Sequence, residues 1–394
     1  MFFSISTKPD SRFTHSTKFQ NLVVSYDSGW HCAGNYLYKG YANDFALASQ
    51  LDCIDQQPGN FCVMVFDHEQ GTVTVKTSRY RSFPVCVNAN CIDNLTETVT
   101  DRIIWSNTEI TVDQQLQITE RELDQIGTVP THVVSTEEVV DRIYNIIDRT
   151  VASFLRNNHL PLKVFLSGGV DSMLVYSFLC RHTDQFELVP GEAFEFDDFW
   201  TRNKDAICNS WAYNQLHHWL NPCVLMTGTP GDEYMLRSPA LANMYLMHHG
   251  TSIPEQLDVY GPCMQHRYFS KAENMDIFQA QSRDKKVQQL VTSRAGLFRQ
   301  LCNENINDYQ HWHLGNTLTW TPLRDLEIFK LMLQLPVEVA VDQIMDSTVS
   351  KQLIARNNPE LLNYVAVEKN YRTLERVWPL ISSWPGSTIP CRVL

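Results

Sequence analysis

The chain has 394 residues, of which 43% are hydrophobic and 19% charged, so it is long enough for two domains with cores of their own. Its formal net charge of −12 disfavours nucleic acid as a partner, because phosphate binding is driven by Lys and Arg. It has no apolar stretch of membrane-spanning length and begins without a signal-peptide pattern. We therefore expect a cytoplasmic protein with no membrane partner.

The first 130 residues are predicted to be β-rich. Short β-branched or aromatic runs cover Leu22–Tyr26, Phe61–Phe66 and Thr72–Thr77, and Asp67–Gly71 supplies a turn between the last two. This pattern predicts a hairpin. The composition then turns polar from 107 to 135, which we interpret as the connection to a second domain. The predicted domains are 1–130 and 131–394.

A capping box, Ser135 to Glu138, predicts that an amphipathic helix opens the second domain. Apolar side chains follow it at helical spacing, namely Val139, Val140, Ile143, Ile146, Ile147, Val151, Phe154 and Leu155. We interpret this stripe as core packing.

The most informative stretch is KVFLSGGVDS, residues 163–172, which runs directly into MLVYSFL. An apolar run, a Ser-Gly-Gly turn and apolar residues at helical spacing predict a buried parallel strand that turns into a helix. Amides at the start of such a helix bind phosphate, and glycines let the backbone approach it. Ser167 and Ser172 can add hydroxyl donors. A carboxylate would repel bare phosphate, so Asp171 is predicted to hold a magnesium ion that bridges phosphate oxygens.

A second apolar run ends in another acidic turn, CVLMTGTPGDEY, residues 223–234. Strand ends in a doubly wound sheet border one crevice, so the two turns are expected to form one metal–nucleotide site. Further along, the apolar positions from Leu326 to Leu335 predict a helix that 319–325 introduces and Pro336 stops.

The turn SGGVDS resembles the SGGxDS pyrophosphate loop of ATP pyrophosphatases, and the other segments narrow the resemblance. Residues 223–234 are similar to the VLSGEGSDELFGGY segment of asparagine synthetases, and 319–336 to their VPFLDxxLVEFALSLP helix. The resemblance implies an adenine nucleotide α-hydrolase-like synthetase domain, with a doubly wound parallel sheet and a helical C-terminus. The branch includes β-lactam synthetase and lasso-peptide cyclase.

The resemblance assigns roles to individual residues. It implies ATP and Mg²⁺ as cofactors, Asp171 and Asp232 as metal ligands, and Asp232, Glu233 and Lys369 as catalytic residues. The implied nucleotide-binding residues are Leu166, Ser167, Gly168, Gly169, Asp171, Ser172 and Gly228. Thr229 replaces a family Glu, which leaves the general base open between Glu192, Glu195, Glu233 and an amine that arrives deprotonated.

The first domain resembles the glutaminase domain of the same family, through PGNFCVMVFD and SRYRSFPV, residues 58–67 and 78–85. That domain uses a cysteine left at the N-terminus as its nucleophile. Phe2 stands in that position here, and no cysteine precedes Cys32. We therefore expect a degenerate Ntn-glutaminase-like domain that does not hydrolyse glutamine.

These observations predict an AMP- and pyrophosphate-forming amide synthetase that adenylates a small-molecule or peptide carboxylate and couples it to an amine. Three alternatives stay open: an intramolecular lactam or macrolactam synthetase, a nucleotide- or tRNA-modifying ATP pyrophosphatase, and a non-catalytic ATP-binding protein. Homodimer formation is also left open.

Overall fold

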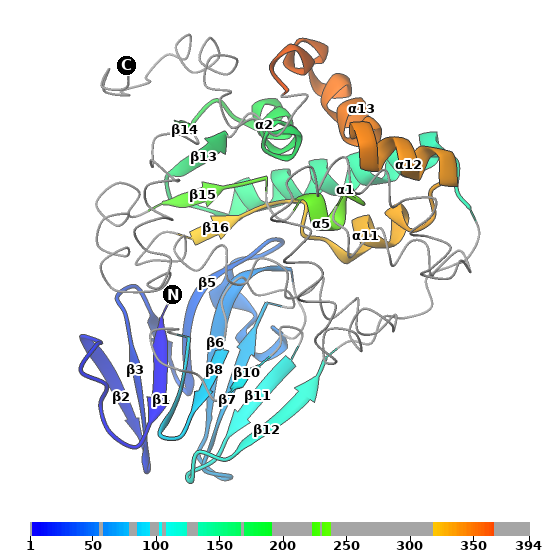
Figure 1. Cartoon of the computed structure of the whole chain (residues 1–394). Coiled ribbons are helices and arrows are strands. Elements are labelled where there is room, and N and C mark those ends of the chain that lie inside the picture. Colours follow the sequence, from blue (N-terminus) through cyan, green and yellow to red (C-terminus); the bar gives the residue numbers. More distant parts are fainter. Residues whose placement is uncertain are drawn as a thin grey trace, which may run out of the picture.

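The computed structural model describes residues 2–54, 58–78, 85–94, 102–104, 108–123, 133–166, 169–190, 223–228, 231–237 and 318–365. Within them, the chain combines antiparallel sheets, a parallel sheet and helices (Figure 1). The prediction of a mixed α/β protein with a β-rich N-terminal part is confirmed at this level. No helix of these residues is both long and apolar enough to cross a membrane.

The N-terminal part contains two six-stranded antiparallel sheets. The first has the order β10 (Arg102–Ile104), β8 (Val85–Asn88), β9 (Cys91–Asp93), β1 (Phe3–Ser6), β3 (Leu22–Tyr26) and β2 (His15–Phe19). The second has the order β12 (Ile118–Glu122), β11 (Thr108–Val112), β7 (Thr72–Thr77), β6 (Gly59–Asp67), β5 (Tyr36–Ala42) and β4 (His31–Ala33). One hydrophobic cluster takes residues from both sheets, so the sheets pack face to face.

Strand β6 is buried on both of its faces. Cys62 and Met64 join the core between the two sheets, whereas Phe61 and Val63 pack in a second cluster beside the 3₁₀ turns η1 (Leu47–Ser49) and η2 (Leu51–Cys53). Alternate side chains of a strand point to opposite faces, which explains the split. The predicted hairpin is confirmed, because β6 pairs antiparallel with β7 and Asp67 lies opposite Thr72.

The prediction of an interdomain connection from 107 to 135 was wrong in its first half. Strands β11 and β12 occupy most of 108–122, and Ile110 and Val112 are fully buried. The polar composition reflects the position of β12 at the edge of the sheet, where most of its residues are exposed. The predicted boundary at residue 130 lies outside the described residues.

The C-terminal part contains a four-stranded sheet whose pairings are all parallel. Its order is β14 (Glu187–Pro190), β13 (Leu162–Leu166), β15 (Val224–Met226) and β16 (Leu318–Trp320). Its helices are α1 (Thr136–Asn157), α2 (Val170–His182), α5 (Gly231–Tyr234), α11 (Leu326–Met332), α12 (Val337–Asp346) and α13 (Thr348–Asn357), followed by the 3₁₀ turn η5 (Pro359–Tyr364). Figure 1 shows this part stacked on the antiparallel sheets.

The predicted start of α1 is confirmed by its cap. The Ser135 hydroxyl accepts a hydrogen bond from the amide of Glu138, which satisfies one of the unpaired donors of the first helical turn. The predicted apolar stripe faces the core, with Ile143 and Val151 fully buried.

The expectation for 319–325 needs a correction. Residues 318–320 form strand β16 at the edge of the parallel sheet, and the helix begins only at Leu326, with Asp325 as its N-cap. The helix ends at Met332, before Pro336, which caps α12 instead. The Pro in the Thr-Pro-Leu segment follows the strand and separates it from the helix.

The two parts meet at an aromatic cluster. Trp320 stacks on Phe154 of α1 with ring centroids 3.9 Å apart, and Tyr41 of β5 packs against Phe154 edge-on. The Trp320 indole N–H donates to Oδ1 of Asn43, 2.7 Å away, and both residues are buried. The antiparallel sheets and the parallel sheet are therefore joined by a satisfied polar contact within an apolar interface.

Candidate functional site

The candidate site lies where the order of the parallel strands reverses. The chain runs from β13 through α2 to β14 on one side, and β15 then pairs with the opposite side of β13. In an open parallel sheet, such a switch point leaves a crevice at the carboxyl ends of the two strands, where ligands bind. Both acidic turns follow these ends, the first after Leu166 and the second after Met226.

The first turn leads directly into helix α2, where its backbone makes the first hydrogen bonds of the helix. Gly169 is the N-cap in an extended conformation, and its carbonyl accepts hydrogen bonds from the Met173 amide and the Ser172 hydroxyl. The Ser172 hydroxyl therefore makes a local bond in this arrangement. Leu166 is fully buried at the end of β13, while Ser167 and Gly168 lie outside the described residues.

The second turn touches the first, backbone against backbone. A Cβ atom added to Gly228 would stand 2.2 Å from the Ser172 nitrogen and 2.4 Å from the carbonyl carbon of Asp171. A Cβ added to Gly231 would stand 2.6 Å from Cβ of Asp171. Only glycine allows approaches this close. Residues some 60 positions apart, counting from 171 to 231, are thus brought together as the sequence predicted.

Arg237 contacts Asp171 directly, and sequence reasoning did not anticipate it. Its Nη1 lies 2.7 Å from Oδ1 and 2.6 Å from Oδ2 of Asp171. The Arg237 side chain is 8% exposed and that of Asp171 18%, so the pair is largely shielded from water. A charge-assisted contact of this kind is among the stronger polar interactions in a protein. The only sequence signal was a single basic residue in the otherwise apolar run from 234 to 237.

Gln343 of α12 holds the segment that carries Arg237 through a hydrogen bond to its backbone. The Gln343 amide nitrogen donates to the Met235 carbonyl at 2.7 Å and to the Ser350 hydroxyl at 3.1 Å. Its amide oxygen accepts from the backbone of Val349 at 2.8 Å. Gln343 is fully buried, so every one of these bonds forms away from water.

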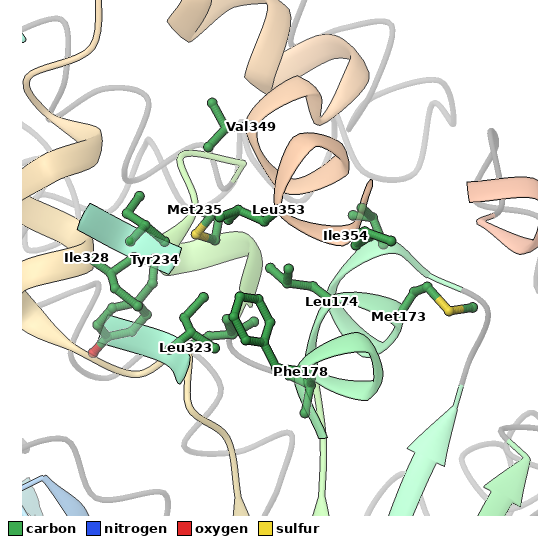
Figure 2. Packing of buried hydrophobic residues seen from close by; sticks show 14 of the residues in the cluster. Met173, Leu174, Phe178, Tyr234, Met235, Leu323, Ile328, Val349, Leu353 and Ile354 are labelled. Carbon is green, nitrogen blue, oxygen red and sulfur yellow. The ribbon is translucent and has the colours of Figure 1, made fainter. Parts of the chain in front are cut away.

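Apolar packing supports the same segment. Figure 2 shows Tyr234 and Met235 in one core with Leu174 and Phe178 of α2, Leu323, and Leu353 of α13. Because α2 and the second turn share this core, a change in one is expected to move the other. The two turns of the site are therefore supported by one hydrophobic core, to which α2 and α13 contribute.

Several residues with a predicted catalytic or metal-binding role lie wholly or partly outside the described residues. Asp232 and Glu233 belong to helix α5, but their side chains lie outside the described residues, as do all of Thr229 and Lys369. The general-base candidates Glu192 and Glu195 lie outside them as well. Their predicted roles stay predictions.

The arrangement bears on the predicted magnesium ligands. Nη1 of Arg237 contacts both carboxylate oxygens of Asp171, so a metal ion bound by that carboxylate would have to share it with the guanidinium. The described residues also contain no group of three or more His, Cys, Asp or Glu side chains placed to hold a metal ion. The metal role of Asp171 therefore stays a prediction.

Comparison with family models gave no match for this chain, and comparison with curated proteins gave none either.

Proposed function

We propose that this protein is an ATP-dependent, AMP- and pyrophosphate-forming amide synthetase. It would adenylate a carboxylate and couple it to an amine without glutamine hydrolysis. The observation that carries the proposal is the contact of Gly228 and Gly231 with Asp171 and Ser172 at the switch point of the parallel sheet. Two glycine turns in contact at the start of a helix suit a phosphate chain better than an apolar ligand.

The proposed roles follow from that geometry. The amides at the start of α2 and the positive end of its dipole would hold phosphate oxygens. The absence of side chains at Gly228 and Gly231 allows the second turn to pack directly against the start of α2. Fixing the nucleotide before reaction would lower the barrier by positioning and by stabilising developing charge. Magnesium would accompany ATP as its counter-ion and neutralise charge on the phosphates.

The finer fold assignments are part of the proposal. We infer that the antiparallel sheets form a degenerate Ntn-glutaminase-like domain, and that the parallel sheet belongs to an adenine nucleotide α-hydrolase-like synthetase domain. We propose the chain as a relative of the asparagine synthetases, in the branch with β-lactam synthetase and lasso-peptide cyclase. Lys369 would stabilise the acyl-transfer transition state, with Asp232 and Glu233 near the metal–pyrophosphate end.

The test is an ATP–pyrophosphate exchange screen over carboxylic acids and peptides. We expect the exchange rate to depend on the presence of one class of carboxylate. In Asp171→Asn the rate should fall by at least about 100-fold, because the site would lose the carboxylate that Arg237 contacts at the start of α2. Exchange at the wild-type rate in that variant would sink the assignment. A parallel assay for glutamate release from glutamine is expected to be negative.

The ion pair between Arg237 and Asp171 also favours a second candidate, a non-catalytic ATP-binding protein. A carboxylate engaged by a buried guanidinium is less available to metal chemistry. This candidate predicts calorimetric ATP binding with no AMP formed across the same panel of acids and amines.

A further inference from the structure

Trp320 joins the antiparallel sheets to the second glycine turn through its side chain and its backbone. Its indole N–H donates to Oδ1 of Asn43, 2.7 Å away, in the loop that follows β5. Its carbonyl accepts a hydrogen bond from the amide of Thr227 at 2.9 Å. Thr227 directly precedes Gly228, whose added Cβ would stand 2.2 Å from the Ser172 nitrogen at the start of α2. One residue therefore lies between the N-terminal part and the nucleotide site.

The surroundings of Trp320 hold it in one position. Its ring stacks on Phe154 with an angle of 15° between the ring planes. Trp320, Asn43 and Thr227 are all buried. The amide of Asn43 donates to the Pro58 carbonyl at 2.9 Å, so the loop that presents the acceptor is itself fixed. A buried N–H without an acceptor is costly, which favours the arrangement in which the indole meets Asn43.

The position of strand β16 depends on this packing. The strand is three residues long, ends at Trp320 and is the last strand of the parallel sheet, paired with β15 alone among the described strands. It also lies against β6 of the antiparallel sheets (Figure 1). A short strand with a partner on one side owes much of its stability to side-chain packing. A shift of Trp320 would therefore move its carbonyl, and with it the start of the second turn.

We propose that Trp320 is a positioning residue through which the antiparallel part sets the geometry of the second glycine turn, and thereby the affinity for nucleotide. This inference rests on the proposed function, because it concerns the same nucleotide site. The N-terminal part then acts on that site through contacts. By thermodynamic linkage the effect is reciprocal, so nucleotide bound at the turn must strengthen the contact at Asn43 by the same factor.

The experiment is a double-mutant cycle on nucleotide affinity. Calorimetry of the full chain uses α,β-methylene-ATP, which resists cleavage between the α- and β-phosphates, with excess Mg²⁺ throughout. Asn43→Ala should raise the dissociation constant about fivefold or more, as is typical of coupling between sites. Trp320→Phe lacks the donor and should do the same. The double variant should bind no more weakly than Trp320→Phe alone. If Asn43→Ala fails to fold, Trp320→Phe removes the same bond from its other end.

A control and a second readout separate positioning from general stability. The buried Ser25 hydroxyl accepts from the Asp10 amide at 3.0 Å, in the antiparallel sheet that does not contain β5 and β6. Ser25→Ala should lower the midpoint of urea unfolding and keep the dissociation constant within about twofold of the wild type. In the wild type, nucleotide should slow amide exchange at residues 42–44. In Trp320→Phe it should not.

Each outcome bears on one claim. Wild-type affinity in Asn43→Ala and Trp320→Phe, losses of affinity that add in the double variant, equal weakening by Ser25→Ala, or exchange at 42–44 that ignores nucleotide overturns the role of Trp320 and leaves the nucleotide site intact. No binding by the wild type overturns the proposed function, and this inference with it.

Discussion

Gly231 and Asp171 lie so close together that a Cβ on the glycine would stand 2.6 Å from Cγ of the aspartate and 2.8 Å from its Oδ1. The backbone φ of Gly231 lies outside the left-handed region, so space alone demands glycine here. The second turn therefore determines where the Asp171 carboxylate sits, and with it the ion pair to Arg237.

Gly231→Ala is expected to displace Asp171 and weaken nucleotide binding. The new methyl group would meet the root of the aspartate side chain, which cannot rotate away, and such overpacking typically costs about 1–3 kcal/mol of stability. Chemical denaturation and calorimetry with ATP would measure both effects. Gly34→Ala is the control, because it has open space around it but a φ of +58°. It should lose about 1–2 kcal/mol through the backbone alone and keep nucleotide affinity. Wild-type affinity in Gly231→Ala would contradict the contact.

Gln343→Leu should destabilise the fold and weaken nucleotide binding. It leaves the buried Met235 carbonyl and Val349 amide without this partner, and each such loss costs about 1–3 kcal/mol. The midpoint of urea unfolding and the affinity for ATP are the readouts. We expect the affinity for ATP to fall because Met235 belongs to the segment 231–237, which contacts Asp171 through Gly231 and Arg237.

The matched control is Gln334→Leu. Gln334 is also buried, but its amide oxygen has no hydrogen-bond partner in the part of the chain that the structure describes. Its replacement by Leu removes an unsatisfied polar atom and should be close to neutral or stabilising. Equal destabilisation by the two substitutions would show that Gln343 matters for its volume and not for its hydrogen bonds.

The buried bond between Asn43 and Trp320 should couple the stability of the two parts of the chain. Asn43→Ala leaves the indole N–H unsatisfied and is expected to lower the free energy of unfolding by about 1–3 kcal/mol. The same change in a Trp320→Phe background, where the donor is absent, should cost less. A double-mutant cycle from urea unfolding measures the difference. Additive costs would mean that this bond does not contribute.

Asp325→Asn should stabilise the protein at neutral pH while keeping the helix cap. Burial raises the pKa of Asp325 above its ordinary value of 3.8, with help from the charges of Glu327 and Asp44. The folded state then binds this proton more tightly than the unfolded state, so its contribution to stability is lost as pH rises through the raised pKa. Asn still accepts from the Glu327 amide but has no charge. Its advantage should grow from pH 3.5 to neutrality in melts. A pH-independent difference would contradict the raised pKa.

Local signals in the sequence predicted the elements that depend on local structure. The Ser135 cap and the stripe of α1 follow from side chains within one or two helical turns, and the β6–β7 hairpin from two short β-branched or aromatic runs around a turn. The meeting of the two glycine turns also followed from the sequence, because parallel strands place their carboxyl ends at one edge.

The remaining features depend on contacts that no local pattern encodes. Strand β16 is three residues long and is defined by pairing with β15, far away in sequence. Arg237 reaches Asp171 across 66 positions. Leu236, directly before Arg237, has a φ of 57°, the left-handed conformation that glycine favours.

Amide hydrogen exchange with and without ATP tests the central claim most directly, because it reports where the nucleotide binds without assuming a substrate. The account predicts slower exchange at the start of α2, residues 170–173, together with slower exchange in the second turn, residues 228–237. Both turns should respond at the same ATP concentration, because they form one site. Protection confined to one turn, or found only in the antiparallel sheets, would contradict the account.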